Sequence, residues 1–127
     1  MTGSVDDSGR ALLRVTVAHP DGTLTETCDA WIDTGFTGSI LLTQAQVAAL
    51  GLPRTAGVLG SLADGSHILF ETYSCRIEWF GRMLSIEALA GAGEFPLLAV
   101  GLLEDLTLTI DYPARTVLLN PPAGLLP

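Results

Sequence analysis

The run Asp33-Thr34-Gly35 carries the clearest chemistry in this chain, because it places a carboxylate directly after an apolar segment. Gly35 allows a tight backbone turn, and Thr34 adds a hydroxyl beside the acid. Two carboxylates about 3 Å apart share one proton, so that one can activate water while the other protonates a carbonyl oxygen. Asp-Thr-Gly occurs once in the 127 residues. One chain therefore supplies half of such a pair.

Strands and turns must position this acid. Alternating apolar residues predict a half-buried strand over 11–18, and the Asp21-Gly22 turn returns the chain through a second strand that ends at Asp33. A short helix is predicted over Thr43–Leu50, where Thr43 and Gln46 form a capping box and Gly51 ends the helix. The other segments alternate as short strands, which is typical of a compact, mostly antiparallel β domain.

Length and composition indicate one folded domain. The chain has 127 residues, of which 48% are hydrophobic and 16% charged, which supplies a core and disfavours disorder. We expect a core over about 11–119 with peripheral tails at 1–10 and 120–127. The net charge of −8 comes from 14 acidic residues and 6 basic ones, all of them arginine. This charge repels phosphate backbones and anionic membranes, so neither nucleic acid nor membrane is an expected partner.

The two cysteines and the termini add little chemistry. Cys28 and Cys75 form no disulfide framework and lack metal-ligand spacing, so they are interpreted as buried free thiols. The first residues are polar and acidic, unlike a signal peptide. The longest apolar stretch, 97–103, is far shorter than the roughly 20 residues of a membrane span. We expect a cytoplasmic protein.

Four features occur in a diagnostic order. They are the run Trp31–Leu42, the helix with Gly51-Leu52-Pro53, the hairpin tip Leu62–Ser66, and Pro96–Leu103 followed by Leu108–Tyr112. Together they resemble the active-site loop, following helix, flap and closing strands of the retropepsin-like (clan AA) aspartic proteases, small bacterial single-domain members in particular. The resemblance covers roughly residues 12–119.

The resemblance implies an all-β fold: a closed retropepsin-like β-barrel with one short helix, equivalent to half of a pepsin-type bilobal fold. It implies a homodimeric aspartic endopeptidase in which Asp33 is catalytic and pairs with Asp33 of a second chain. Thr34 would make interchain hydrogen bonds and Gly35 would line the substrate floor. The flap would close over an extended peptide; its residues would be Leu62, Ala63, Asp64, Gly65 and Ser66. No metal or organic cofactor is implied.

One departure from the family pattern favours a second hypothesis. The pattern has glycine after two apolar residues, where this chain has Ala99, although Gly101 follows two residues later. A methyl group at that glycine position would press on the catalytic loop. The alternative is a catalytically silent retropepsin-like module that dimerises and binds peptides. A third, weaker option is an unrelated β-barrel with a small-molecule role.

Several other residues have plainer interpretations. Asp64-Gly65 also suits an ordinary hairpin tip, so its flap assignment depends on position. Asp111 precedes a Tyr-Pro turn, and a structural role is the better interpretation. His19 and His67 lie beside turns without partners at catalytic or metal spacing. Trp31 is more consistent with packing than with ligand stacking, and so is Phe36.

Overall fold

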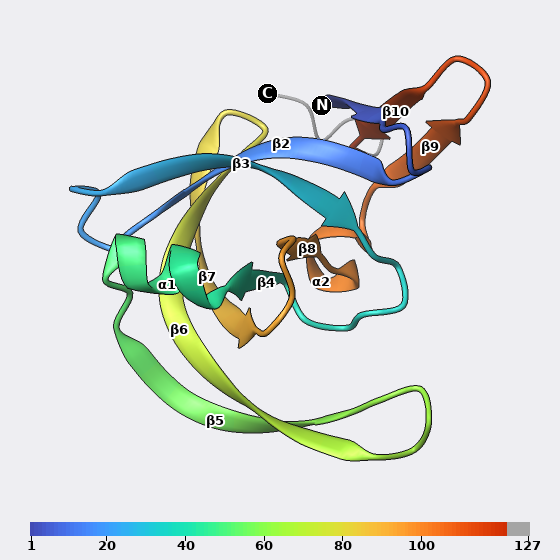
Figure 1. The fold of residues 1–127 in the computed structure, drawn as a ribbon. Coiled ribbons are helices and arrows are strands. Elements are labelled where there is room, and N and C mark those ends of the chain that lie inside the picture. The colour runs from blue at the N-terminus through green and yellow to red at the C-terminus, as the bar shows by residue number, and fades with distance from the viewer. Residues whose placement is uncertain (122–127) are drawn as a thin grey trace.

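A computed structural model describes residues 1–121 of the chain (Figure 1). Its elements, in chain order, are β1 (Thr2–Val5), β2 (Ala11–Ala18), β3 (Thr25–Ile32), β4 (Ile40–Thr43), α1 (Gln44–Leu50), β5 (Arg54–Ser61), β6 (His67–Trp79), β7 (Arg82–Gly91), β8 (Leu97–Leu98), α2 (Val100–Leu103), β9 (Thr107–Asp111) and β10 (Thr116–Asn120).

The strands of residues 1–121 form one sheet that closes on itself. Their order is β5-β6-β7-β4-β8-β3-β2-β1-β10-β9, and β6 also pairs with β2. This extra pairing closes a barrel of β2, β3, β8, β4, β7 and β6. Two extensions leave the barrel: the β5–β6 arm at the bottom of Figure 1, and the β1–β10–β9 layer at its top.

The barrel core follows the predicted alternation. Leu13, Val15 and Val17 of β2 are buried, as the pattern over 11–18 predicts. On β3, Ala30 and Ile32 are buried while Trp31 between them faces outward. The antiparallel register pairs Val15 with Cys28 and Leu12 with Trp31. The core therefore lies inside the barrel, and β3 leads from it to Asp33.

Helix α1 begins and ends where its sequence predicts. Thr43 Oγ1 accepts the N–H of Gln46, and Gln46 Oε1 accepts the N–H of Thr43, which completes the capping box. Gly51 ends the helix with a left-handed φ of 60°. Val47 and Leu50 face the core. The helix covers one end of the barrel, on the left of Figure 1.

Three expectations need correction. Residues 1–10 are no simple tail, because β1 pairs with both β2 and β10 in the sheet. A second helix, α2, was missed because its four residues are too few to give a helical period. Asn120 of the expected 120–127 tail belongs to β10, and residues 122–127 lie outside the described part of the chain.

Candidate active site

Asp33 is held where β3 leaves the barrel. Its backbone N–H donates to the carbonyl of Leu98 at 2.9 Å, and its carbonyl accepts the N–H of Phe36 at 3.3 Å. Its side-chain Oδ1 accepts the N–H of Gly35 at 2.9 Å. Oδ2 accepts no hydrogen bond from residues 1–121, and the side chain is partly exposed. The carboxylate is therefore fixed in place with one oxygen open to a ligand or a second acid.

Strand β8 explains why this point is rigid. It lies between β3 and β4, parallel to β3 and antiparallel to β4. The loop 33–39, which joins β3 to β4, must therefore pass around the end of β8. Trp31 pairs with Leu97 and Ile32 with Leu98. The strand that carries Asp33 is thus held by a neighbour on each side, β2 and β8.

The start of α2 packs directly against this loop. The N–H of Ala99 donates to the carbonyl of Ser39, and the N–H of Gly101 donates to the carbonyl of Gly38, both at 2.9 Å. A Cβ on Gly101 would lie 2.7 Å from the Gly38 carbonyl oxygen. Ala99 is fully buried. The approach that excludes a side chain therefore occurs at Gly101, two residues beyond Ala99.

Thr34 and Gly35 complete the turn in different ways. Gly35 closes the turn through its bond to the Asp33 carboxylate. The Thr34 side chain is exposed, and its hydroxyl makes no hydrogen bond within the described residues. The backbone of residue 35, rather than the Thr34 hydroxyl, therefore fixes the loop inside one chain.

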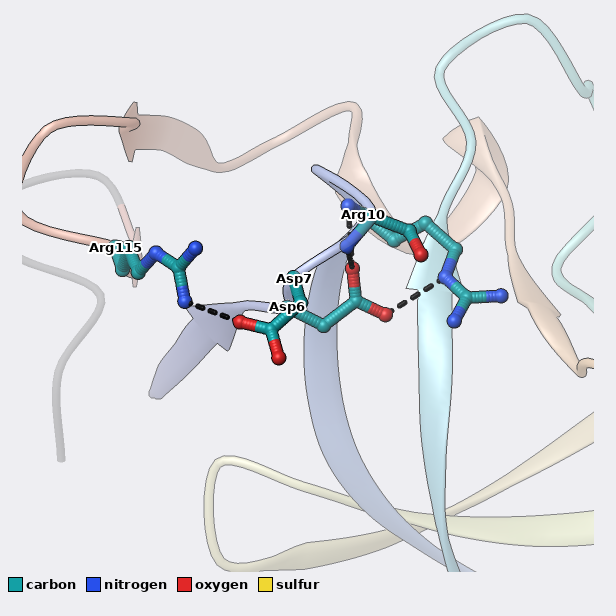
Figure 2. A network of polar contacts seen from close by, with 5 residues as sticks. Asp6, Asp7, Arg10 and Arg115 are labelled. Carbon is teal, nitrogen blue, oxygen red and sulfur yellow. Dashed lines mark hydrogen bonds and ion pairs between the residues drawn. The ribbon is translucent and has the colours of Figure 1, made fainter.

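A related run, Asp7-Ser8-Gly9, lies in the loop between β1 and β2. There it is Asp6, and not Asp7, that accepts the N–H of Ser8, at 3.0 Å. The Asp7 side chain is 96% exposed and pairs with Arg115 at 2.7 Å (Figure 2). This run belongs to a surface ion-pair network, so it gives the chain no second carboxylate like Asp33.

A groove of about 500 Å³ runs between the loop 33–39 and the β5–β6 arm. On the loop side it is lined by residues 35–38, and on the arm side by residues 59–62 and Phe70. The rings of Phe36 and Phe70 meet edge to face, with their centroids 6.3 Å apart. The arm therefore contacts the loop through an aromatic pair. Phe70 is not among the site residues predicted from the sequence, and its alternation with Ile68 in β6 was the available signal.

The tip of the arm is a self-contained turn. Asp64 Oδ1 accepts the N–H of Ser66 at 2.9 Å and its hydroxyl at 2.6 Å. The hydroxyl bond is the larger cause that lowers the pKa of Asp64. Gly65 takes a φ of +87°, and Leu62 and Ser66 close the hairpin through a 2.8 Å backbone bond. Of the five predicted flap residues, Leu62 lines the groove, and the other four form or adjoin the turn.

A second, more apolar hollow of about 370 Å³ shares Phe70 with the groove. Trp31 and Phe95 line it, and the Arg10 guanidinium lies over both rings, 5.7 and 4.0 Å from their centroids. Asp6 holds Arg10 through a 2.7 Å bond to Nε, as Figure 2 shows. Trp31 thus adjoins a ligand-sized hollow as well as packing. The pattern of single residues in the sequence does not reveal the Arg10 contact.

The remaining candidates have structural roles. Asp111 Oδ1 accepts the N–H of Ala114 at 3.0 Å, which confirms its interpretation as a turn residue. His67 contacts Ser61 at 3.2 Å across the arm, and His19 pairs with Asp21. Both cysteines are free, as predicted, with Cys75 buried and Cys28 partly so. Burial raises the pKa of each thiol to about 11.

No group of three or more His, Cys, Asp or Glu side chains within residues 1–121 could hold a metal ion. Neither helix of the described chain is long and apolar enough to cross a membrane.

Comparison with known proteins identifies the fold. No protein-family model matches the chain, and no curated protein sequence matches it. Among solved structures, the EIAV protease complexed with the inhibitor HBY-793 superposes with a TM-score of 0.56. The match covers 79% of this chain and 90% of that one, at 19% sequence identity. At this identity the likeness bears on the fold alone, and the fold is all-β and retropepsin-like, as the sequence predicts.

Proposed function

We propose that the protein is a homodimeric aspartic endopeptidase in which Asp33 of one chain pairs with Asp33 of a second copy. The observation that carries this proposal is the placement of Asp33. It follows a strand held on both sides, its Oδ1 is bound by Gly35, and its Oδ2 has no partner among residues 1–121. A retropepsin-like fold with one such aspartate needs a second copy to complete a dyad.

In the proposed reaction the two Asp33 carboxylates share one proton, because two like charges about 3 Å apart cannot both be ionised. The ionised carboxylate takes a proton from water as the water oxygen attacks the scissile carbonyl carbon. The protonated carboxyl gives its proton to the carbonyl oxygen. The carboxyl that took the proton from water then gives it to the leaving nitrogen, and the C–N bond breaks. One hydroxyl of the intermediate returns its proton to the other carboxylate, so that an amine and a carboxylic acid leave and the dyad again holds one proton. The exposed Thr34 hydroxyl is available for a bond across the dimer.

The proposed substrate is a peptide bound in extended form in the groove between residues 35–38 and the β5–β6 arm. Leu62, Ala63, Asp64, Gly65 and Ser66 act as the flap. Backbone hydrogen bonds from the arm and loop bind the peptide independently of its sequence, and hollows beside them select side chains. The lining by Phe36, Phe70 and Leu59 favours apolar side chains.

The test is an Asp33→Asn variant, assayed on a peptide library at acidic and at neutral pH, because a dyad that shares one proton works between its two apparent pKa values. The change preserves side-chain shape and removes the acid, so we expect cleavage to fall by at least about a thousandfold. Asp21→Asn is the matched control, because Asp21 also accepts a turn N–H but lies in the β2–β3 hairpin. It should leave cleavage unchanged. If the wild-type protein cleaves no peptide at either pH, the proposal fails.

The second candidate function is a catalytically silent module that dimerises and binds peptides. The observation that favours it is the full burial of Ala99, whose backbone N–H is bonded to the Ser39 carbonyl of the loop 33–39. An Ala99→Gly variant separates the two functions. If the wild type is inert and Ala99→Gly gains Asp33-dependent cleavage, the silent module is correct. If the wild type cleaves peptides, the silent module is excluded.

A further inference from the structure

The sheet of residues 1–121 has two edges, and they differ in how they are protected. Strand β5 carries a bulge between Arg54 and Ala56 and two glycines, Gly57 and Gly60. Bulges, glycine and charge at an edge all discourage pairing with another chain. Strand β9, Thr-Leu-Thr-Ile-Asp, has no bulge and no glycine, and its register with β10 runs without a break. Its one charged residue, Asp111, lies at the end of the strand. Edge β9 is therefore the one open to a partner.

The sequence of β9 is complementary to itself. In an antiparallel pair, side chains directly opposite each other lie on the same face of the sheet. With Thr109 opposite its own copy, all five residues pair: Leu108 meets Ile110, and Thr107 meets Asp111. Shifting the centre to residue 108 or 110 leaves part of the strand unpaired. The Thr109-centred register also keeps each Asp111 away from its copy, which matters in a chain of charge −8.

A partner strand would bury more apolar surface on the half-buried face of β9. Leu108 and Ile110 pack against the core but remain partly exposed. In the paired strands, Leu108 of each copy would contact Ile110 of the other copy. This contact would remove more of their apolar surface from water. The opposite face presents Thr107 and Thr109, which can hydrogen-bond across the pair.

The β9 edge also lies on the side of the molecule where a partner is needed. Only the four-residue α2 and its short flanking turns separate β8, which binds Asp33, from β9. In Figure 1 the loop after β3, the tip of the β5–β6 arm and β9 all lie on the right, away from α1. The Asp7–Arg115 pair ties the β9–β10 turn to the loop before β2 (Figure 2). This ion pair helps to hold the β9 edge in one position relative to the barrel.

We infer that two copies of the chain join through their β9 edges, antiparallel and centred on Thr109, so that one continuous sheet crosses the dimer axis. The inference rests on the proposed function, because it names the surface through which the second Asp33 arrives. It adds the interface strand and its register.

Cysteine cross-linking tests the register. In a Thr109→Cys variant, the two cysteines face each other with Cα atoms about 4.5 or 5.5 Å apart, within the range a disulfide accepts. Thr107→Cys is the matched control on the same face of the same strand. Its two copies would lie about 14 Å apart, because they are offset by four residues. Both variants keep the native Cys28 and Cys75. Burial raises the pKa of these two thiols to about 11, so that they form little of the reactive thiolate.

On oxidation of the full-length variants, we expect Thr109→Cys to give a disulfide-linked dimer on a non-reducing gel and Thr107→Cys to remain a single chain. The double variant Thr107→Cys/Asp111→Cys should also link. After dilution, the oxidised Thr109→Cys variant should have at least about ten times the cleavage activity of the reduced form. The disulfide holds the two chains together, so that pairing no longer depends on concentration.

The outcomes separate the inference from the proposed function. If Thr109→Cys does not link while sedimentation finds a dimer with Asp33-dependent cleavage, the interface lies elsewhere and this inference is overturned while the function stands. Equal linking of Thr107→Cys and Thr109→Cys also overturns it, because the register is then wrong. A monomer without any cleavage activity contradicts both proposals.

Discussion

Two turns in this molecule use the same local chemistry and have opposite surroundings. At Asp33, a carboxylate oxygen accepts the N–H of the residue two positions on, at 2.9 Å, and Asp64 makes the same bond at the same distance. The Asp33 loop is also bonded to β8 and α2 through Leu98, Ala99 and Gly101. The Asp64 turn bonds only within its own hairpin, among the described residues.

This difference explains how one groove can combine a fixed wall with a movable one. A dyad requires its carboxylate to be held to a fraction of an ångström, which the barrel provides for Asp33. A flap must open to admit a peptide, and segments with few buried contacts open at low cost. The β5–β6 arm, the proposed flap, meets this condition, since Leu59 and Leu69 are each 66% exposed.

The largest expected difference is in the free energy of unfolding, between a leucine truncation in the barrel and one in the β5–β6 arm. Leu98 is fully buried beside Asp33, so Leu98→Ala should lower the free energy of unfolding by about 2–5 kcal/mol. Leu69→Ala on the arm should change it by less than about 0.5 kcal/mol. Urea denaturation of both variants measures the contrast. Equal losses would mean that the arm is as firmly packed as the barrel.

A smaller effect is expected from adding one methyl group behind the loop. Gly101→Ala places a Cβ against the Gly38 carbonyl, and we expect a loss of about 1–3 kcal/mol in unfolding free energy. Cleavage activity should fall as well, because Gly38 belongs to the groove wall. Gly93→Ala is the control, since a Cβ there meets no atom within 4 Å. A Gly101→Ala protein of full stability and activity would show that α2 does not fix the loop.

The next largest effect is expected from the contact between the loop and the arm. Phe36 belongs to the loop and Phe70 to the arm, and an edge-to-face pair contributes about 0.5–1.5 kcal/mol beyond its buried area. A double-mutant cycle with Phe36→Leu and Phe70→Leu should give a coupling energy in this range. Hydrogen exchange of the arm should rise in either single variant. A coupling energy of zero would mean that the arm is not held by the loop.

The smallest effect concerns pH at the arm tip. The Ser66 hydroxyl and N–H lower the pKa of Asp64 below its ordinary value. The turn's contribution to stability is therefore fully present above about pH 4 and is lost as pH falls through the lower folded-state pKa. Ser66→Ala should raise the Asp64 pKa, measured by carboxyl-carbon NMR titration, and leave that of Asp21 unchanged. An unchanged Asp64 pKa would contradict the hydroxyl bond.

The sequence predicted features whose causes are local. Leu13, Val15 and Val17 alternate because one face of β2 is buried, and the Thr43–Gln46 capping box needs only residues three apart. The sequence also predicted that the Asp33 turn follows a strand whose last inward-facing residues, Ala30 and Ile32, are buried. These elements depend on neighbours in the chain, which a single sequence displays.

The rest depends on contacts between distant segments. Strand β1 carries no strong apolar pattern, and it forms because β2 and β10 lie on either side of it. Leu24 extends the apolar alternation of β3 yet lies outside the strand and is 48% exposed. The Asp33 and Asp64 turns look alike in sequence, and only β8 and α2, more than sixty residues beyond Asp33, distinguish them.

The distance between the two Asp33 carboxylates in a crystal structure of the protein tests the central claim most directly. The proposed dyad predicts a symmetric dimer with these groups about 3 Å apart on the two-fold axis. Carboxylates more than about 6 Å apart, or separate monomers in the crystal and in solution, would contradict it, because two acids at that distance cannot share a proton.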